Sequence, residues 1–216
     1  MDLDTLHAHN INEATGELFL LEPQPTDDSA GEGITPITSA QFLRNFLYLD
    51  GLDSRSKIIL HMNTPGGDWV HGMAIHDAIR NSNKHVVAIN YGEARSMSSV
   101  IFLAADTRIM APNSKFMLHA GSEAVAGTVK QVLTAAKQTK HNQTVMLEVY
   151  LSAMRHAPVF KGLSKSTRKK WLVGRMDAEE EVYFTAPEAV KYGFADHILG
   201  NNGWDWGRIF DEDIIW

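Results

Sequence analysis

The chain contains no cysteine among its 216 residues. This absence excludes disulfide bonds, a cysteine nucleophile and a metal site with cysteine ligands, and it fits a reducing compartment. No apolar run reaches the length of about 18 residues that a membrane-spanning helix needs. The first ten residues, MDLDTLHAHN, lack the basic start and the apolar middle of a secretion signal. We therefore expect a soluble cytoplasmic protein that does not associate with a membrane.

The chain also lacks an excess of positive charge. Lysine and arginine total 20 and aspartate and glutamate total 26, which gives a formal net charge of −6. Because binding to a phosphate backbone favours a basic face, this balance argues against nucleic acid as the main partner. Histidine occurs ten times, but no pair has the spacing of a metal-binding HExxH motif. We therefore expect no metal site.

What is present is the pattern of one α/β domain. The length is sufficient for a single domain with a sizeable core. Apolar runs of strand length alternate with segments whose apolar residues recur at helical spacing, which predicts a largely parallel sheet covered by helices. The expected strands are 17–21, 57–62, 86–91, 107–110 and 115–119. The expected helices are one that begins at a cap on Thr38 or Ser39, then 70–82, 96–105, 128–155 and 186–193.

We expect three regions along the chain. Residues 1–16 are polar and predicted to be flexible, residues 17–199 form the domain, and residues 200–216 form an acidic tail rich in tryptophan. The tail is expected either to dock in a neighbouring subunit or to pack on its own domain. The long helix 128–155 is polar all round in its middle, so it is expected to project from the core or to pack on another subunit.

Ser96 is the first candidate for chemistry. It follows a strand and the turn NYGEAR, and it opens an apolar helix. The unpaired amides at a helix N-terminus carry partial positive charge, which suits an oxyanion beside a nucleophile. The same position is typical of a simple helix N-cap, and the local sequence alone favours that interpretation.

Two other segments point to the same place. The turn NTPGGDW at 63–69 follows a strand, and its glycines leave amides without side-chain cover, so Gly67 and Met97 are able to direct their N–H groups at one point. His119 ends the strand 115–119. Because the carboxyl ends of parallel strands gather at one edge, we expect Gly67, Ser96 and His119 to meet. A lone TPGG turn or one histidine among ten is weak support.

Five motifs together carry more information than any one of them. Their order and spacing resemble the proteolytic subunit of the Clp protease over most of residues 37–199. The resemblance implies a crotonase-like spiral of strand–strand–helix units, as in that family, with 128–155 as a protruding handle helix. The motifs are NTPGG at 63–67, GMAIHDAI at 72–79, GEARSMSS at 92–99, APNSKFMLH at 111–119 and YFTAPEAVKYGFADHI at 183–198.

The resemblance implies a role for each matching residue. Ser96 is the nucleophile, His119 is its general base, and the amides of Gly67 and Met97 form the oxyanion hole. The chain departs from the family at Ser98, where a small glycine-type residue is usual.

The third member of the triad is an aspartate in the family. Counted back without gaps from the aromatic residue of the last motif, its position is Glu181. Glu180 and Asp177 remain alternatives if the loop is placed differently. An acidic run such as 177–181 is also typical of a solvated surface.

The implied function is a serine-type endopeptidase that cleaves peptides or unfolded proteins through an acyl-enzyme on Ser96, with no cofactor. In the family, two stacked heptameric rings enclose the sites and an AAA+ unfoldase feeds them. The loop 23–36 and the segment 155–175 look expanded, so ring size and unfoldase stay open, and a viral or accessory member is conceivable. Two alternatives remain. They are an inactive ring or scaffold subunit, and a crotonase-type coenzyme A enzyme that would not need the Ser96–His119 pair.

Overall fold

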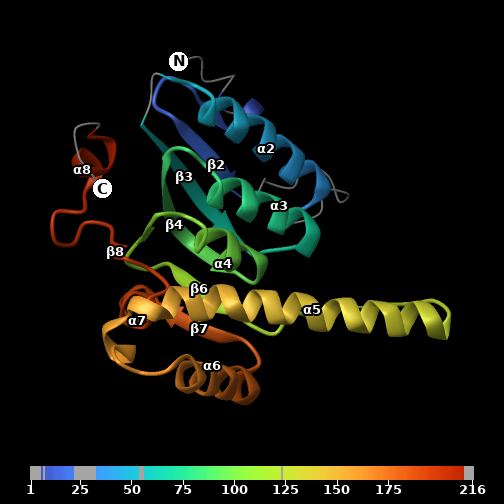
Figure 1. Ribbon diagram of the computed structural model, residues 1–216. Helices are drawn as coiled ribbons and strands as arrows, with labels where there is room; N and C mark the ends of the chain where they lie inside the picture. The colour runs from blue at the N-terminus through green and yellow to red at the C-terminus, as the bar shows by residue number, and fades with distance from the viewer. Residues whose placement is uncertain (1–5, 7, 22–32, 54–55, 123, 212–216) are drawn as a thin grey trace.

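The computed structural model describes residues 6, 8–21, 33–53, 56–122 and 124–211 (Figure 1). Most of the expected loop 23–36 and the end of the tail, with Trp216, lie outside the described residues.

A mixed sheet forms the centre of the molecule. Its order is β1-β2-β3-β4-β5-β8, and β6 pairs with both β4 and β7. All pairs are parallel except β1–β2 and β6–β7. The expected α/β class and largely parallel sheet are therefore confirmed. The strands are β1 (Ile11–Asn12), β2 (Glu17–Leu21), β3 (Lys57–Thr64), β4 (His85–Arg95), β5 (Thr107–Met110), β6 (Lys115–Leu118), β7 (Val182–Thr185) and β8 (His197–Ile198).

Strand β4 is long enough to pair with two successive strands on one side. Its residues 87–90 pair with β5, and its residues 93–95 pair with β6. The Asn90 side chain marks the change of partner, because its amide donates to the carbonyl of Lys115 at 2.9 Å. This change of partner places the end of β6 beside the end of β4. Ser96 directly follows β4 and His119 directly follows β6, so both lie at this place.

Helices α2, α3 and α4 cover one face of the sheet, and α5 extends far beyond the body of the molecule (Figure 1). This projection agrees with the prediction for the polar helix 128–155. The helices are α2 (Pro36–Asp50), α3 (Trp69–Arg80), α4 (Met97–Phe102), α5 (Val129–Ala153), α6 (Lys165–Glu179), α7 (Ala186–Tyr192) and α8 (Trp206–Phe210), with 3₁₀ turns at Met154–His156 and Pro158–Phe160.

The start of α2 corrects one sequence-based expectation. Thr35 is the N-cap, not Thr38 or Ser39, and Thr35 and Thr38 form a reciprocal capping box. Pro36 occupies the first turn, where its missing N–H has no intrahelical partner to lose. Ser39 is buried, and its hydroxyl donates to the carbonyl of His71 at 3.0 Å, which joins α2 to α3.

The first and last described segments of the chain extend the sheet or cover it. In the N-terminal segment that we expected to be flexible, β1 pairs with β2, and the buried Asn12 donates to Glu17 at 2.8 Å. At the other end, α8 places the fully buried Ile209 on the far face of the sheet. The described part of the tail therefore packs on its own domain, and Trp206 stacks on Tyr91.

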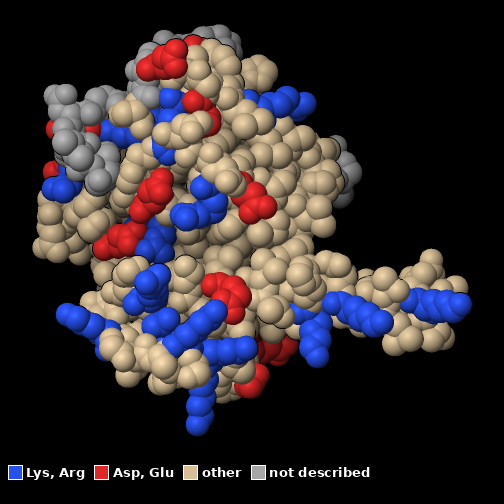
Figure 2. Space-filling view, viewed as in Figure 1, with Lys and Arg blue, Asp and Glu red and all other residues tan. Residues whose placement is uncertain are grey.

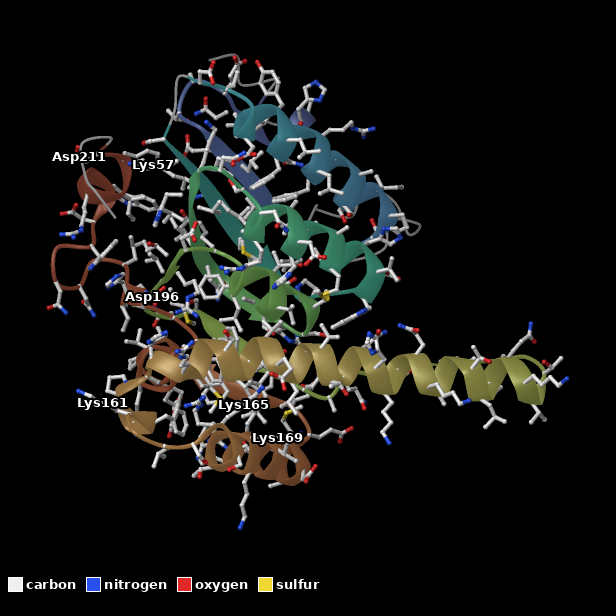
Figure 3. All side chains as sticks on the ribbon, in the orientation of Figure 1. Lys57, Lys161, Lys165, Lys169, Asp196 and Asp211 are labelled. Atoms are coloured by element: carbon white, nitrogen blue, oxygen red, sulfur yellow. The ribbon has the colours of Figure 1, made fainter. Side chains whose placement is uncertain are left out.

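Charge is distributed unevenly over the visible surface. Figure 2 shows lysine and arginine gathered around α6 and the turns before it. Lys161, Lys165 and Lys169 come from this region (Figure 3). No helix of the described part of the chain has the length and apolarity to cross a bilayer.

Candidate active site

Ser96 lies at a strained junction between β4 and α4. Its backbone has φ 52° and ψ −124°, a positive φ that non-glycine residues rarely adopt. The Ser96 amide donates to the carbonyl of Met117 at 3.0 Å, which fixes the turn against β6. The Ser96 side chain makes no capping hydrogen bond. The junction therefore presents the hydroxyl to the site instead of to the helix backbone.

His119 follows β6 and meets that hydroxyl. Its Nε2 atom lies 2.7 Å from Ser96 Oγ. If the hydroxyl donates, Nε2 is unprotonated and the ring proton is on Nδ1. Burial lowers the pKa of His119 below its ordinary value of 6.5, Glu181 opposes this shift, and Arg95 adds to it. The site therefore favours the neutral imidazole, the form that accepts a proton.

The turn after β3 lies against the same junction. Gly66 and Gly67 have φ of +108° and +140°. A Cβ atom on Gly66 would lie 2.8 Å from Ser96 Cβ and 3.0 Å from Met97 N, so glycine permits the close approach. Among the described residues, the amides of Gly67 and Met97 donate to no hydrogen-bond acceptor. Two such amides beside the Ser96 hydroxyl have the arrangement that an oxyanion hole requires.

A cavity of ≈ 550 Å³ opens onto these groups. Its lining includes Ser96, Met97, His119 and Gly67 on one side. The polar middle of α5 forms another wall, through residues such as Asn142. Ser96 and His119 are thus accessible from this cavity, and the polar stretch of α5 borders the same space.

The three acidic candidates lie in different settings. Strands β6 and β7 pair antiparallel with Leu118 opposite Val182, and continuing this register by one pair places Glu181 opposite His119. Glu181 also has a larger electrostatic effect on the pKa of His119 than Glu180. Asp177 lies earlier, in the last turns of α6.

Glu181 nevertheless makes no hydrogen bond to the imidazole. Its Oε2 atom accepts the Tyr183 hydroxyl at 3.0 Å, and its Oε1 atom lies 3.9 Å from Arg95 Nη2. Within the part of the chain that the structure describes, no carboxylate accepts a hydrogen bond from His119 Nδ1. The structure brings together Ser96, His119 and the amides of Gly67 and Met97, but it places no described carboxylate in hydrogen-bond contact with His119.

Sequence patterns assigned no role to Ser99, Tyr150 or Thr64. They singled out Ser98 only as a departure from the motif. Ser99 Oγ donates to the carbonyl of Ser96 at 2.6 Å and lies 2.8 Å from Tyr150 Oη. Tyr150 comes from α5 and is fully buried, and this burial raises the pKa of its hydroxyl. The buried Ser98, which departs from the family pattern, donates to Thr64 Oγ1 at 3.1 Å. The only signal for them was two serines in an otherwise apolar helix.

Known proteins resemble this chain over most of its length. Residues 29–202 match the Clp protease family. The chain is 28% identical over 170 residues to the ATP-dependent Clp protease proteolytic subunit 1 of Leifsonia xyli, a match that covers 78% of this chain and 80% of that protein. It is 29% identical to the ATP-dependent Clp protease proteolytic subunit of Deinococcus radiodurans, with 76% and 77% covered. It is 28% identical to the ATP-dependent Clp protease proteolytic subunit of Streptococcus pneumoniae, a match that covers 82% of this chain and 82% of that protein. With this match and the architecture described above, the chain belongs to the Clp protease family.

Proposed function

We propose that this chain is a serine-type endopeptidase that acts through an acyl-enzyme on Ser96. The observation that carries the proposal is the 2.7 Å contact between Ser96 Oγ and His119 Nε2, at the edge of an open cavity. A hydroxyl is a weak nucleophile unless an adjacent base takes its proton, and this pair supplies both groups.

The chemistry follows from the positions of the groups. His119 Nε2 takes the Ser96 proton as Oγ attacks the carbonyl carbon of a peptide bond in the cavity. The negative charge on the carbonyl oxygen is stabilised by the amides of Gly67 and Met97. His119 then protonates the leaving amine, and water, activated by the same imidazole, hydrolyses the ester on Ser96. Glu181 is the proposed third member, which would stabilise the imidazolium as it forms.

The same family membership supports a ring assembly. Relatives of this chain are named as proteolytic subunits of an ATP-dependent protease, so we propose stacked rings fed by an ATP-driven unfoldase. The first turns of α5 expose Val129, Val132 and Leu133. Apolar side chains on a projecting helix are typical of a surface that another subunit covers.

Labelling of Ser96 with a fluorophosphonate and hydrolysis of a small peptide ester test this function. The parent protein is expected to react in both assays. Ser96→Ala is expected to lose the label and at least about 10³-fold in the rate of hydrolysis. Ser152→Ala is the matched control, because Ser152 is exposed on α5. Hydrolysis at equal rates in the parent and in Ser96→Ala would refute the proposal.

One observation favours a second candidate, an inactive ring or scaffold subunit. No described carboxylate orients His119, and both oxygens of Glu181 face other groups. A scaffold would assemble into rings but would not react with the fluorophosphonate at Ser96. A coenzyme A enzyme of the crotonase type has no use for the Ser96–His119 contact, and the same label separates it from the peptidase.

A further inference from the structure

Arg95 directly precedes Ser96, and its side chain reaches across β6, the strand that His119 follows. Arg95 on β4 is in register with Met117 on β6, and Met117 is in register with Tyr183 on β7. Side chains at matched positions of neighbouring strands lie on the same face of a sheet. The Arg95 guanidinium carbon accordingly lies 5.8 Å from the centre of the Tyr183 ring. The side chain thus spans from β4 to β7.

At the far end of this span, Arg95 faces the carboxylate that is opposite His119. Its Nη2 atom lies 3.9 Å from Glu181 Oε1, while Tyr183 donates to the other oxygen at 3.0 Å. Its Nη1 atom lies 3.4 Å from Glu93 Oε2. Both oxygens of Glu181 are therefore directed at Arg95 and Tyr183, and neither at the imidazole.

The contact between Arg95 and Glu181 is of a kind that breaks easily. The Arg95 side chain is 30% exposed and that of Glu181 is 46% exposed, so solvent screens the pair. The buried Nε atom of Arg95 has no hydrogen-bond partner among the described residues, so this arrangement leaves a donor unsatisfied. A rotation of the Glu181 side chain toward His119 would exchange the weak ion pair with Arg95, together with the hydrogen bond from the exposed Tyr183, for a hydrogen bond to Nδ1.

We propose that Arg95 is a positioning residue that holds Glu181 away from His119, so that the guanidinium and the imidazole compete for one carboxylate. The proposal rests on the proposed function, because it assigns Glu181 to the peptidase site. In the resting form, Ser96 and His119 then act as a dyad, and Glu181 contacts Arg95 and Tyr183 instead of His119.

The sign of the effect follows from the charges around His119. The groups that face it are Ser96 Oγ from the start of α4, Arg95 at the end of β4, and Glu180 and Glu181 before β7. Loss of the Arg95 charge removes a cation near the imidazole and frees an anion to approach it. Both changes stabilise the imidazolium, so they move the acid limb of the activity profile in the same direction, to higher pH.

The experiment compares Arg95→Gln, Arg95→Lys, Glu181→Gln and the double variant Arg95→Gln/Glu181→Gln in the full-length chain. The rate of fluorophosphonate labelling at Ser96 is measured from about pH 5 to about pH 9, the range in which histidine titrates. Arg95→Gln is expected to move the acid limb to higher pH and to raise the plateau rate by about 3- to 10-fold, a modest part of what a positioned acid–base group contributes. Arg95→Lys keeps the charge and is expected to stay closer to the parent.

The double variant isolates the competition for Glu181. In the Glu181→Gln background, Arg95→Gln is expected to leave the plateau rate unchanged, because no carboxylate remains to be released. Arg155→Gln is the matched control, since Arg155 is an exposed arginine in the 3₁₀ turn Met154–His156 that follows α5. An Arg95→Gln plateau and acid limb equal to those of the parent would overturn the proposal, as would an equal gain in the double variant.

Nuclear magnetic resonance of the His119 ring separates this proposal from the proposed function. A parent protein that never labels at Ser96 contradicts the peptidase, but the titration of His119 still tests Arg95. Arg95→Gln is expected to raise the pKa of His119 and to give a downfield Nδ1 proton signal that Glu181→Gln removes. Unchanged ring signals in Arg95→Gln and in Arg95→Lys would overturn the inference even in an active enzyme.

Discussion

Replacing Gly66 with alanine is expected to damage both stability and the proposed nucleophile. At φ +108°, a Cβ atom on Gly66 would lie 2.7 Å from the Arg95 carbonyl oxygen, 2.8 Å from Ser96 Cβ and 3.0 Å from Met97 N. Two of these atoms are backbone, so they cannot rotate away. The positive φ costs a side chain about 1–2 kcal/mol, and overpacking adds about 1–3 kcal/mol. We therefore expect a loss of about 2–5 kcal/mol in the free energy of unfolding.

Two other glycines provide controls for this prediction. Gly162 has φ +79° with no atom within 4 Å of a built Cβ, so Gly162→Ala should lose only the backbone part, about 1–2 kcal/mol. Gly174 lies in α6, is equally open and has an ordinary φ, so Gly174→Ala should gain about 0.5–1 kcal/mol. Urea denaturation at one protein concentration measures all three.

Labelling of Ser96 then reads the functional consequence. Gly66→Ala is expected to slow fluorophosphonate labelling by at least about 10²-fold, because a small displacement of reacting groups has effects of that size. Gly162→Ala and Gly174→Ala should label as the parent does. If Gly66→Ala matched Gly162→Ala in both stability and labelling, the close approach of this turn to the nucleophile would not matter.

Three further outcomes are expected. Because burial lowers the pKa of His119, the folded protein keeps the imidazole neutral below pH 6.5, so the acid limb of ester hydrolysis should fall below that pH; a midpoint above 6.5 would contradict this. The same shift contributes stability that is complete above pH 6.5, the ordinary pKa of the unfolded chain. This stability is lost as the pH falls from 6.5 through the lower pKa of the folded protein, and urea denaturation midpoints should follow this loss. Tyr150→Phe removes the hydroxyl that contacts Ser99 and should lower the free energy of unfolding by about 1 kcal/mol. An unchanged free energy of unfolding would contradict this contact. Asp196→Ala removes the carboxylate that binds Arg108 through both oxygens and should lower it by about 1–3 kcal/mol; an unchanged denaturation midpoint would count against this.

Sequence patterns predicted the presence of the strands and helices around the site better than the residues at which they begin and end. The apolar runs at 57–62 and 86–91 are strands, but both continue further, to Thr64 and Arg95. Most of the extra residues are polar or small, and the continuous apolar run ends before the strand hydrogen bonds do, although Thr64 and Ala94 are still buried. The expected helix start was wrong because Thr35, Thr38 and Ser39 are all residue types that cap helices. The reciprocal hydrogen bonds of Thr35 and Thr38 place the cap at Thr35, and Ser39 binds the His71 carbonyl instead.

For the site, local sequence left Ser96 ambiguous between nucleophile and cap. The motifs and their order favoured the interpretation as a nucleophile. In the structure, the positive φ of Ser96 turns its side chain away from the capping position. The set of partners around Glu181 was beyond any local pattern, since Arg95 and Tyr183 are 88 residues apart in number and meet only across β6.

By itself the sequence determined the α/β class and the family, and it singled out the candidate serine, histidine and glycine turn, because each depends on residue type and short spacing. The tertiary structure alone decided that β4 changes partners from β5 to β6, which brings Ser96 and His119 within 2.7 Å. It alone also decided that Glu181 faces Arg95 and Tyr183 instead of the imidazole. The physical reason is that strand register and side-chain reach are set by long-range packing, which no short window of sequence contains.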